Sequence, residues 1–314
     1  MNPSSIKDDF ARLVSYARTP QPPPEEPRHR FAYGMAQPLL GARLLLRDRP
    51  LLKQALEPAL VLAMVCALTA FFGIGPGKTF LARFYQTFAL LAPLPSVVFA
   101  KHYARMSAAV RNKLGFGPVE PRREPLHTVL FRAGAQAVVV AIGLIPVIAM
   151  LKLVPALGEP LAKVLAGLWA LQWVVIDAFD DARVLKPGET LRTLDRQAEL
   201  TQRPWFVRFF RSLGDGLPGV VGGPFNWFAG FLDKLSKSFR EECALVERNP
   251  ALAAGFALTT AVLLATPVLN LAFRPIILVA SAHLLGHLEK TEPSGLERAP
   301  LSQAQPPVLR LPLA

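Results

Sequence analysis

Apolar residues along this chain fall into six blocks separated by polar, mostly basic segments. Five blocks hold about twenty residues each, and the sixth holds about thirteen. Because an α-helix rises about 1.5 Å per residue, about twenty apolar residues cross a hydrocarbon layer of roughly 30 Å, whereas about thirteen reach only about 20 Å. The sixth block is therefore too short to span this layer alone. The blocks lie at about 56–74, 80–100, 133–154, 161–179, 251–273 and 276–288.

Short turns pair these blocks into three predicted hairpins, at about 56–100, 133–179 and 251–288. Glycine and proline at 73–77 end the first block, and two prolines predict a kink or break in the second. The last hairpin should enter the membrane only partway, with its apex near 267–274, because each arm reaches only about 20–24 Å. We therefore expect an all-α, polytopic membrane protein of three hairpins, at least one of them partly penetrating.

Proline placement gives the second and third hairpins a weak internal repeat. Pro146 is followed nine residues later by Pro155, and Pro267 is followed eight residues later by Pro275. Proline-interrupted apolar segments often mark broken helices near a transport site. The alternative is chance, because 30 of the 314 residues are proline.

Basic residues are concentrated on one side of the predicted hairpins. Segments 28–53 and 101–127 carry six Lys or Arg each and segment 181–250 carries eleven, whereas the three short turns carry one each. Positive residues remain on the cytoplasmic side of membrane helices. We therefore predict a multi-pass protein of a bacterial inner membrane, with both termini and segment 181–250 in the cytoplasm.

The composition of the chain favours a lipid bilayer as its partner and indicates which part of the chain is folded. Lys and Arg outnumber Asp and Glu by 35 to 23. Because this charge flanks apolar blocks, it favours a lipid bilayer as the partner and disfavours nucleic acid. Only two cysteines are present, which disfavours a disulfide framework.

Residues 1–30 lack the apolar core of a signal peptide. They and residues 291–314 are rich in proline, so we expect disordered tails on both sides of a membrane domain at 31–290.

Segment 190–248 is predicted to form cytoplasmic amphipathic helices. Aromatic residues and arginines are interleaved over 203–211, and the four aromatics fall on one helical stripe, which suits a helix at the lipid headgroups. A glycine-rich break over 214–224 precedes a second amphipathic helix over 228–246. The alternative is that the aromatic stripe packs on this second helix. The predicted lipid-interface residues are Arg203, Trp205, Phe206, Arg208, Phe209, Phe210 and Arg211.

Candidate catalytic and metal motifs are weak, and we predict no enzyme, no metal and no cofactor. Gly75–Thr79 lacks the first glycine of a phosphate-binding loop, because Phe72 occupies that position. His283 and His287 stand four apart and share a helix face, but the glutamate of a zinc-protease motif does not follow the first histidine. A pair of interfacial histidines is the simpler interpretation.

Three aspartates gather at the end of the fourth apolar block, at positions 177, 180 and 181. Acidic residues near membrane depth are energetically costly and are often functional. Asp177, Asp180 and Asp181 could bind a cation or pair with Arg183. The simpler interpretation is a helix end that enters the headgroup layer.

The last apolar region carries recognisable short motifs. They read Ala254-Gly255-Phe256-Ala257, then Thr266-Pro267-Val268-Leu269-Asn270, then Val279-Ala280-Ser281-Ala282. This pattern resembles the C-terminal signature of the CysZ sulfate permeases and the related etoposide-induced ER proteins. Alanine at 257 and serine at 281 stand where that family has glycine. The resemblance is most specific over 248–286 and extends loosely over 40–290.

The resemblance implies a helical membrane protein with partly penetrating hairpins that transports or conducts a small inorganic anion such as sulfate. Arg47, Arg49 and Lys53 would attract the anion at the membrane surface, and Asn270 would contact it near the hairpin apex. The alternative is a non-transporting membrane scaffold, which the aromatic and basic segment 203–211 favours. A homo-oligomer is compatible with either.

Overall fold

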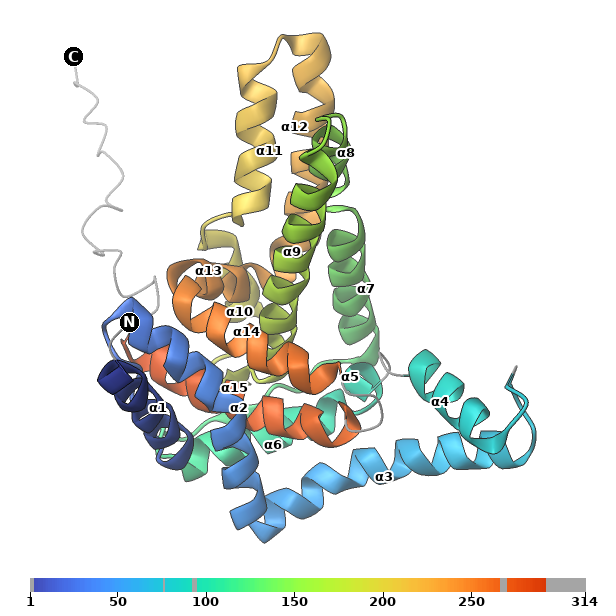
Figure 1. The fold of residues 1–314 in the computed structure, drawn as a ribbon, viewed down its shortest axis with the longest axis vertical. Coiled ribbons are helices and arrows are strands. Elements are labelled where there is room, and N and C mark those ends of the chain that lie inside the picture. Colours follow the sequence, from blue (N-terminus) through green and yellow to red (C-terminus); the bar gives the residue numbers. More distant parts are fainter. Residues whose placement is uncertain (1–2, 76, 92–94, 266–269, 292–314) are drawn as a thin grey trace, which may run out of the picture.

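The computed structural model describes residues 3–75, 77–91, 95–265 and 270–291, and it is almost entirely helical (Figure 1). Two two-residue strands, β1 (Glu120–Pro121) and β2 (Val184–Leu185), pair antiparallel. The helices are α1 (Pro3–Arg18), α2 (Pro27–Arg47), α3 (Arg49–Phe71), α4 (Phe80–Leu91), α5 (Pro95–Val98), α6 (Ala100–Lys113), α7 (Leu126–Ile142), α8 (Ile145–Lys152), α9 (Gly158–Asp181), α10 (Leu191–Leu200), α11 (Trp205–Gly216), α12 (Gly219–Ser236), α13 (Arg240–Arg248), α14 (Pro250–Leu264) and α15 (Asn270–Thr291).

Three helical runs are long and apolar enough to cross a membrane: α3, the run of α7 with α8, and α9. This confirms the prediction of an all-α chain with helices suited to a membrane. The helix α3 begins where the Asp48 side chain accepts a hydrogen bond from the Leu51 amide, 3.2 Å away, and it ends before Gly73, whose φ of +72° favours glycine. The return helix α4 has only 12 residues, about 18 Å, so it cannot span alone.

The central body of the molecule forms where α2 packs along α14 and α15. Glycines allow the backbones to approach closely. A Cβ atom at Gly34 would lie 2.2 Å from the carbonyl oxygen of Leu252, and one at Gly255 would lie 2.0 Å from that of Phe31. Any side chain at these two positions would push the helices apart.

The sixth apolar block lies inside this body and does not face lipid. The helix α15 is 22 residues long, and residues 277–286 are continuously buried among α2, α3, α6, α9 and α14. The block of thirteen residues is thus part of a longer helix that neighbouring helices cover, and its entry into a membrane stays a prediction. The apex residues 266–269 lie outside the described residues.

The N-terminal segment is helical, so a disordered tail at 1–30 is a wrong prediction for most of it. The helix α1 packs on α2, and the rings of Tyr16 and Tyr33 meet edge to face with centroids 5.4 Å apart. Arg28 also forms an ion pair with Asp9. The proline-rich sequence at 22–24 only connects the two helices. The predicted C-terminal tail lies almost wholly outside the described residues.

Segment 190–248 forms a hairpin of α11 and α12 that rises beside α9 (Figure 1). The helix α12 packs on α7. The helix α11 contacts α9 through the rings of Trp205 and Trp169, whose centroids lie 5.9 Å apart. Two predictions are wrong here. The break at 214–224 is mostly helical, because α12 already begins at Gly219. The expected helix at 228–246 is interrupted by a 3₁₀ turn at Lys237–Phe239.

Candidate functional site

The foot of α9 holds a closed network of four buried charges. Arg122 lies 3.1 Å from Asp180 and 2.6 Å from Glu124. Arg132, on α7, lies 2.9 Å from Asp180 and 2.6 Å from Glu124. All four side chains are nearly buried. Burial lowers the pKa of Arg122, but the facing carboxylates of Asp180, Glu124 and Glu242 raise it more, so the net shift is upward. The ion pair of Arg132 with Asp180 ties α7 to α9.

The other two aspartates of α9 face a second arginine. Asp177 and Asp181 stand four residues apart, so they share a helix face. Arg274, near the start of α15, lies 3.0 Å from Asp181 and 3.4 Å from Asp177. The predicted partner, Arg183, instead pairs with Glu241 and Glu242 of α13. The three aspartates thus join α9 to its neighbours, and the possibility that they pair with Arg183 is wrong, whereas a helix end in the headgroup layer stays a prediction.

Sequence reasoning missed the arginines of this network, although one signal was present. Arg132 is a lone charge close to the start of an apolar run, and such a charge requires a carboxylate partner. Its partners come from positions 8 and 48 residues away along the chain. Spacing alone could not identify them.

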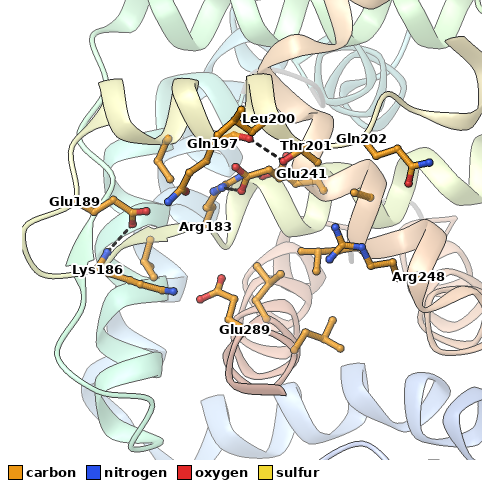
Figure 2. Close-up of a pocket in the computed structure, with 17 residues that line it drawn as sticks. Arg183, Lys186, Glu189, Gln197, Leu200, Thr201, Gln202, Glu241, Arg248 and Glu289 are labelled. Carbon is orange, nitrogen blue, oxygen red and sulfur yellow. Dashed lines mark hydrogen bonds and ion pairs between the residues drawn. The ribbon is translucent and has the colours of Figure 1, made fainter. Parts of the chain in front are cut away.

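A hollow of about 250 Å³ lies between β2, α10, α13 and α15 (Figure 2). Lys186 and Glu289 extend toward each other across it, while Arg183 lies beside Glu241 (Figure 2). Glu289 also accepts a hydrogen bond of 2.6 Å from Arg111. The charged residues that line the hollow include both signs, so the hollow does not select an anion over a cation. The charged residues are Arg183, Lys186, Arg248, Glu189, Glu241, Glu242 and Glu289.

The two histidines of α15 lie within the body of the protein. His283 is fully buried, and its Nδ1 lies 2.8 Å from Oε1 of Gln37. Its ring centroid is 4.7 Å from that of His287, and Phe116 packs against both rings. Among the described residues, no group of three His, Cys, Asp or Glu could hold a metal ion. His283 is thus enclosed by its neighbouring helices, and its position relative to a membrane interface stays a prediction.

The predicted anion-binding cations lie together at the junction of α2 and α3. Arg47, Arg49 and Lys53 are all exposed, and none forms an ion pair with any residue that the structure describes. Between them, Asp48 pairs with Lys113 of α6. The hydrogen bond from Lys113 lowers the pKa of this carboxyl. Asn270 is the first residue of α15, but its side chain lies outside the described part, so its predicted contact stays a prediction.

The predicted lipid-interface residues are mostly engaged inside the protein. Phe206 and Phe210 are fully buried, and the ring of Phe210 meets that of Phe228 with centroids 4.9 Å apart. Lipid contact is therefore wrong for these two residues: Phe206 packs against Trp169 and Trp173 of α9, and Phe210 packs on α12, as the alternative predicted. Phe209 is 41% exposed. Trp205 and Arg211 are partly buried.

Two of the three arginines of this segment have protein partners as well. Arg203 lies 3.1 Å from Asp233, and Arg208 lies 2.7 Å from Glu247. A carboxylate already satisfies each guanidinium, which weakens the case for a headgroup there.

Comparisons with protein-family models, with curated proteins and with solved structures gave no match to this chain. The resemblance to the sulfate permeases therefore remains an expectation from short motifs.

Proposed function

We propose that the protein is an integral membrane protein of a bacterial inner membrane that transports or conducts a small sulfate-like anion. The observation that carries this proposal is the cluster of Arg47, Arg49 and Lys53. These side chains are exposed and without ion-pair partners among the described residues, at the beginning of a helix suited to cross the membrane. Arginines inside the body, such as Arg122 and Arg274, are held by carboxylates.

Electrostatics makes the start of α3 attractive to an anion. The aligned peptide dipoles of α3 place partial positive charge beside Arg49 and Lys53, whereas the C-terminus of α2 places partial negative charge beside Arg47, so the attraction comes mainly from the three side chains. Asp48 opposes this field, but its charge is shared with Lys113. The net electric field at the start of α3 therefore favours anions over cations.

In this proposal both termini, α10 and α13 lie on the cytoplasmic side of the membrane. The α11–α12 hairpin lies beside α7 and α9, so it shares their layer instead of lying in the cytoplasm. Its exposed residues support this: Val220 is 92% exposed and Trp227 is 71% exposed. Such apolar exposure is costly in water and is favourable in lipid.

A non-transporting scaffold is the second candidate. It is favoured by one observation: in the described part of the chain, the hollow of Figure 2 is lined by the body and not by α3, α7 or α9. A scaffold would need α3, α7 and α9 only to anchor it in the membrane.

Sulfate uptake into proteoliposomes containing the full-length protein tests the proposal. We expect flux above that of empty vesicles. Lys53→Ala should lower it about fivefold, because one cation near a membrane surface contributes about 1 kcal/mol. Arg192→Ala, an exposed cation on α10, is the matched control and should leave flux unchanged.

Two results would contradict the proposal in different ways. Absence of flux in the wild type would favour the scaffold. Flux that responds equally to Lys53→Ala and Arg192→Ala would show transport by another route.

A further inference from the structure

A second basic surface lies where α6 approaches the start of α7. It surrounds an open hollow of about 360 Å³, lined by Lys101 and Arg105 of α6 and by Arg123, Glu124 and Pro125 before α7. The side chains of Lys101, Arg105 and Arg123 are exposed. Within the described part of the chain, none of these three cations forms an ion pair.

The carboxylate in this hollow does not neutralise the three cations. Glu124 is buried, and its two oxygens lie 2.6 Å from Arg122 and 2.6 Å from Arg132. Both oxygens are thus engaged in the network at the foot of α9. The hollow therefore presents three uncompensated positive charges.

Helix geometry makes this arrangement unfavourable without a bound anion. Lys101 and Arg105 stand four residues apart on α6, so they share one face of the helix, where like charges repel each other. Arg123 approaches from a separate segment and adds to the repulsion. An anion that contacts all three would convert this repulsion into attraction.

Apolar side chains are exposed on the first turns of α7, the helix that begins directly after Pro125 in the lining of this hollow. Leu126 is 58% exposed, Leu130 is 52% exposed and Phe131 is 71% exposed, all in the first two turns of the helix. Leu126 and Leu130 lie on one helix face because they stand four apart. A ligand that is anionic at one end and apolar at the other would match the two surfaces together. A free inorganic anion would use only the first.

We propose that this hollow binds the phosphate of an anionic phospholipid, whose acyl chains lie on the first turns of α7. Basic hollows at the cytoplasmic ends of membrane helices suit such headgroups, because each cation near the surface adds attraction and the bilayer supplies the ligand. The inference rests on the membrane placement in the proposed function but not on transport.

Native mass spectrometry of the full-length protein in mild detergent tests this site. The probes are phosphatidylglycerol, phosphatidylcholine with matched acyl chains, and inorganic phosphate. We expect phosphatidylglycerol adducts at far lower lipid concentration than phosphatidylcholine adducts. The triple variant Lys101→Gln, Arg105→Gln, Arg123→Gln should weaken phosphatidylglycerol binding by about a hundredfold, at about fivefold for each cation.

The matched control removes the same charge elsewhere. The triple variant Arg192→Gln, Arg196→Gln, Lys234→Gln changes exposed cations of α10 and α12, and it should bind phosphatidylglycerol as the wild type does. Both triples alter only exposed positions, so both should fold, as circular dichroism can verify.

Equal loss in both triples would overturn the proposal, because net charge and not the hollow would then control binding. Inorganic phosphate that displaces the lipid at equal concentration would assign the hollow to a free anion. Neither result depends on sulfate flux, so failure here is distinguishable from failure of the transport proposal.

Discussion

Two hairpins of similar composition meet different surroundings in this protein. The α7–α9 hairpin and the α14–α15 hairpin are both apolar, and both contain the spaced prolines of the internal repeat. Yet Phe131 is 71% exposed and Val164 is 60% exposed, whereas residues 277–286 are continuously buried. Hydropathy therefore identifies helices that avoid water, but it does not say whether lipid or protein replaces the water.

Small residues account for the difference. A Cβ atom at Gly255 of α14 would lie 2.0 Å from a carbonyl oxygen of α2, whereas one at Gly134 of α7 or Gly167 of α9 would meet nothing within 4 Å. Glycine on a helix face permits close approach only where a partner helix is present. Gly255 of α14 has such a partner in α2, whereas Gly134 of α7 and Gly167 of α9 face open space.

The largest effect on stability is expected at the foot of α9, where the buried charges tie α7 to α9. Asp180→Asn leaves Arg122 and Arg132 with a missing carboxylate, and breaking a buried charge network typically costs about 4 kcal/mol. Glu159→Gln is the control at the far end of α9, where the pair with Lys163 is 70% exposed or more, so no measurable change is expected. Thermal unfolding in detergent compares the two. Equal melting temperatures would show that the network is not structural.

The second largest effect on stability is expected when a buried leucine of α15 is replaced by alanine, compared with an exposed leucine of α9. Leu284 on α15 is fully buried, so Leu284→Ala should leave a cavity and cost about 3 kcal/mol. Leu168 on α9 is 59% exposed, and Leu168→Ala should cost less than about 1 kcal/mol in detergent. The same melting experiment measures both variants. A larger loss at Leu168 would mean that α9, and not α15, lies in the core.

Glycine substitution gives a smaller but sharper contrast. Gly255→Ala should cost about 2 kcal/mol, because the added methyl group overlaps the backbone of α2. Gly167→Ala has open space and a better helix former, so the melting temperature should hold or rise. If Gly255→Ala is also neutral, α2 and α14 are not in contact.

The smallest effect concerns acid sensitivity at the junction of α2 and α3. Because Lys113 lowers the pKa of Asp48 in the folded protein, their pairing stabilises the fold above the ordinary pKa of the carboxyl. This contribution, below about 1 kcal/mol for a partly exposed pair, is lost as the pH falls below about 4. Asp48→Asn should therefore flatten the acid side of the melting-temperature profile. A profile that keeps its full slope would assign the acid sensitivity to other carboxylates.

Periodicity and turn chemistry in the sequence predicted the helical class, the break after α3 and the turn between α7 and α9. Those features depend on residues that are neighbours along the chain. The burial of α15 and the partners of Arg132 depend on residues far apart in sequence, so no local pattern contains them. The segment at 203–211 shows the same limit, because an aromatic stripe has the same spacing whether it meets lipid or α12.

The pairing of α2 with α14 also determines the order in which parts of the protein can assemble during synthesis. About 200 residues separate the end of α2 at Arg47 from the start of α14 at Pro250. At roughly 5–20 residues per second, a ribosome needs on the order of 10–40 s to make that stretch. During this interval α3, α7 and α9 emerge in turn, while the glycine face of α2 has no partner. The body of the protein therefore assembles last, after its arms have been synthesised.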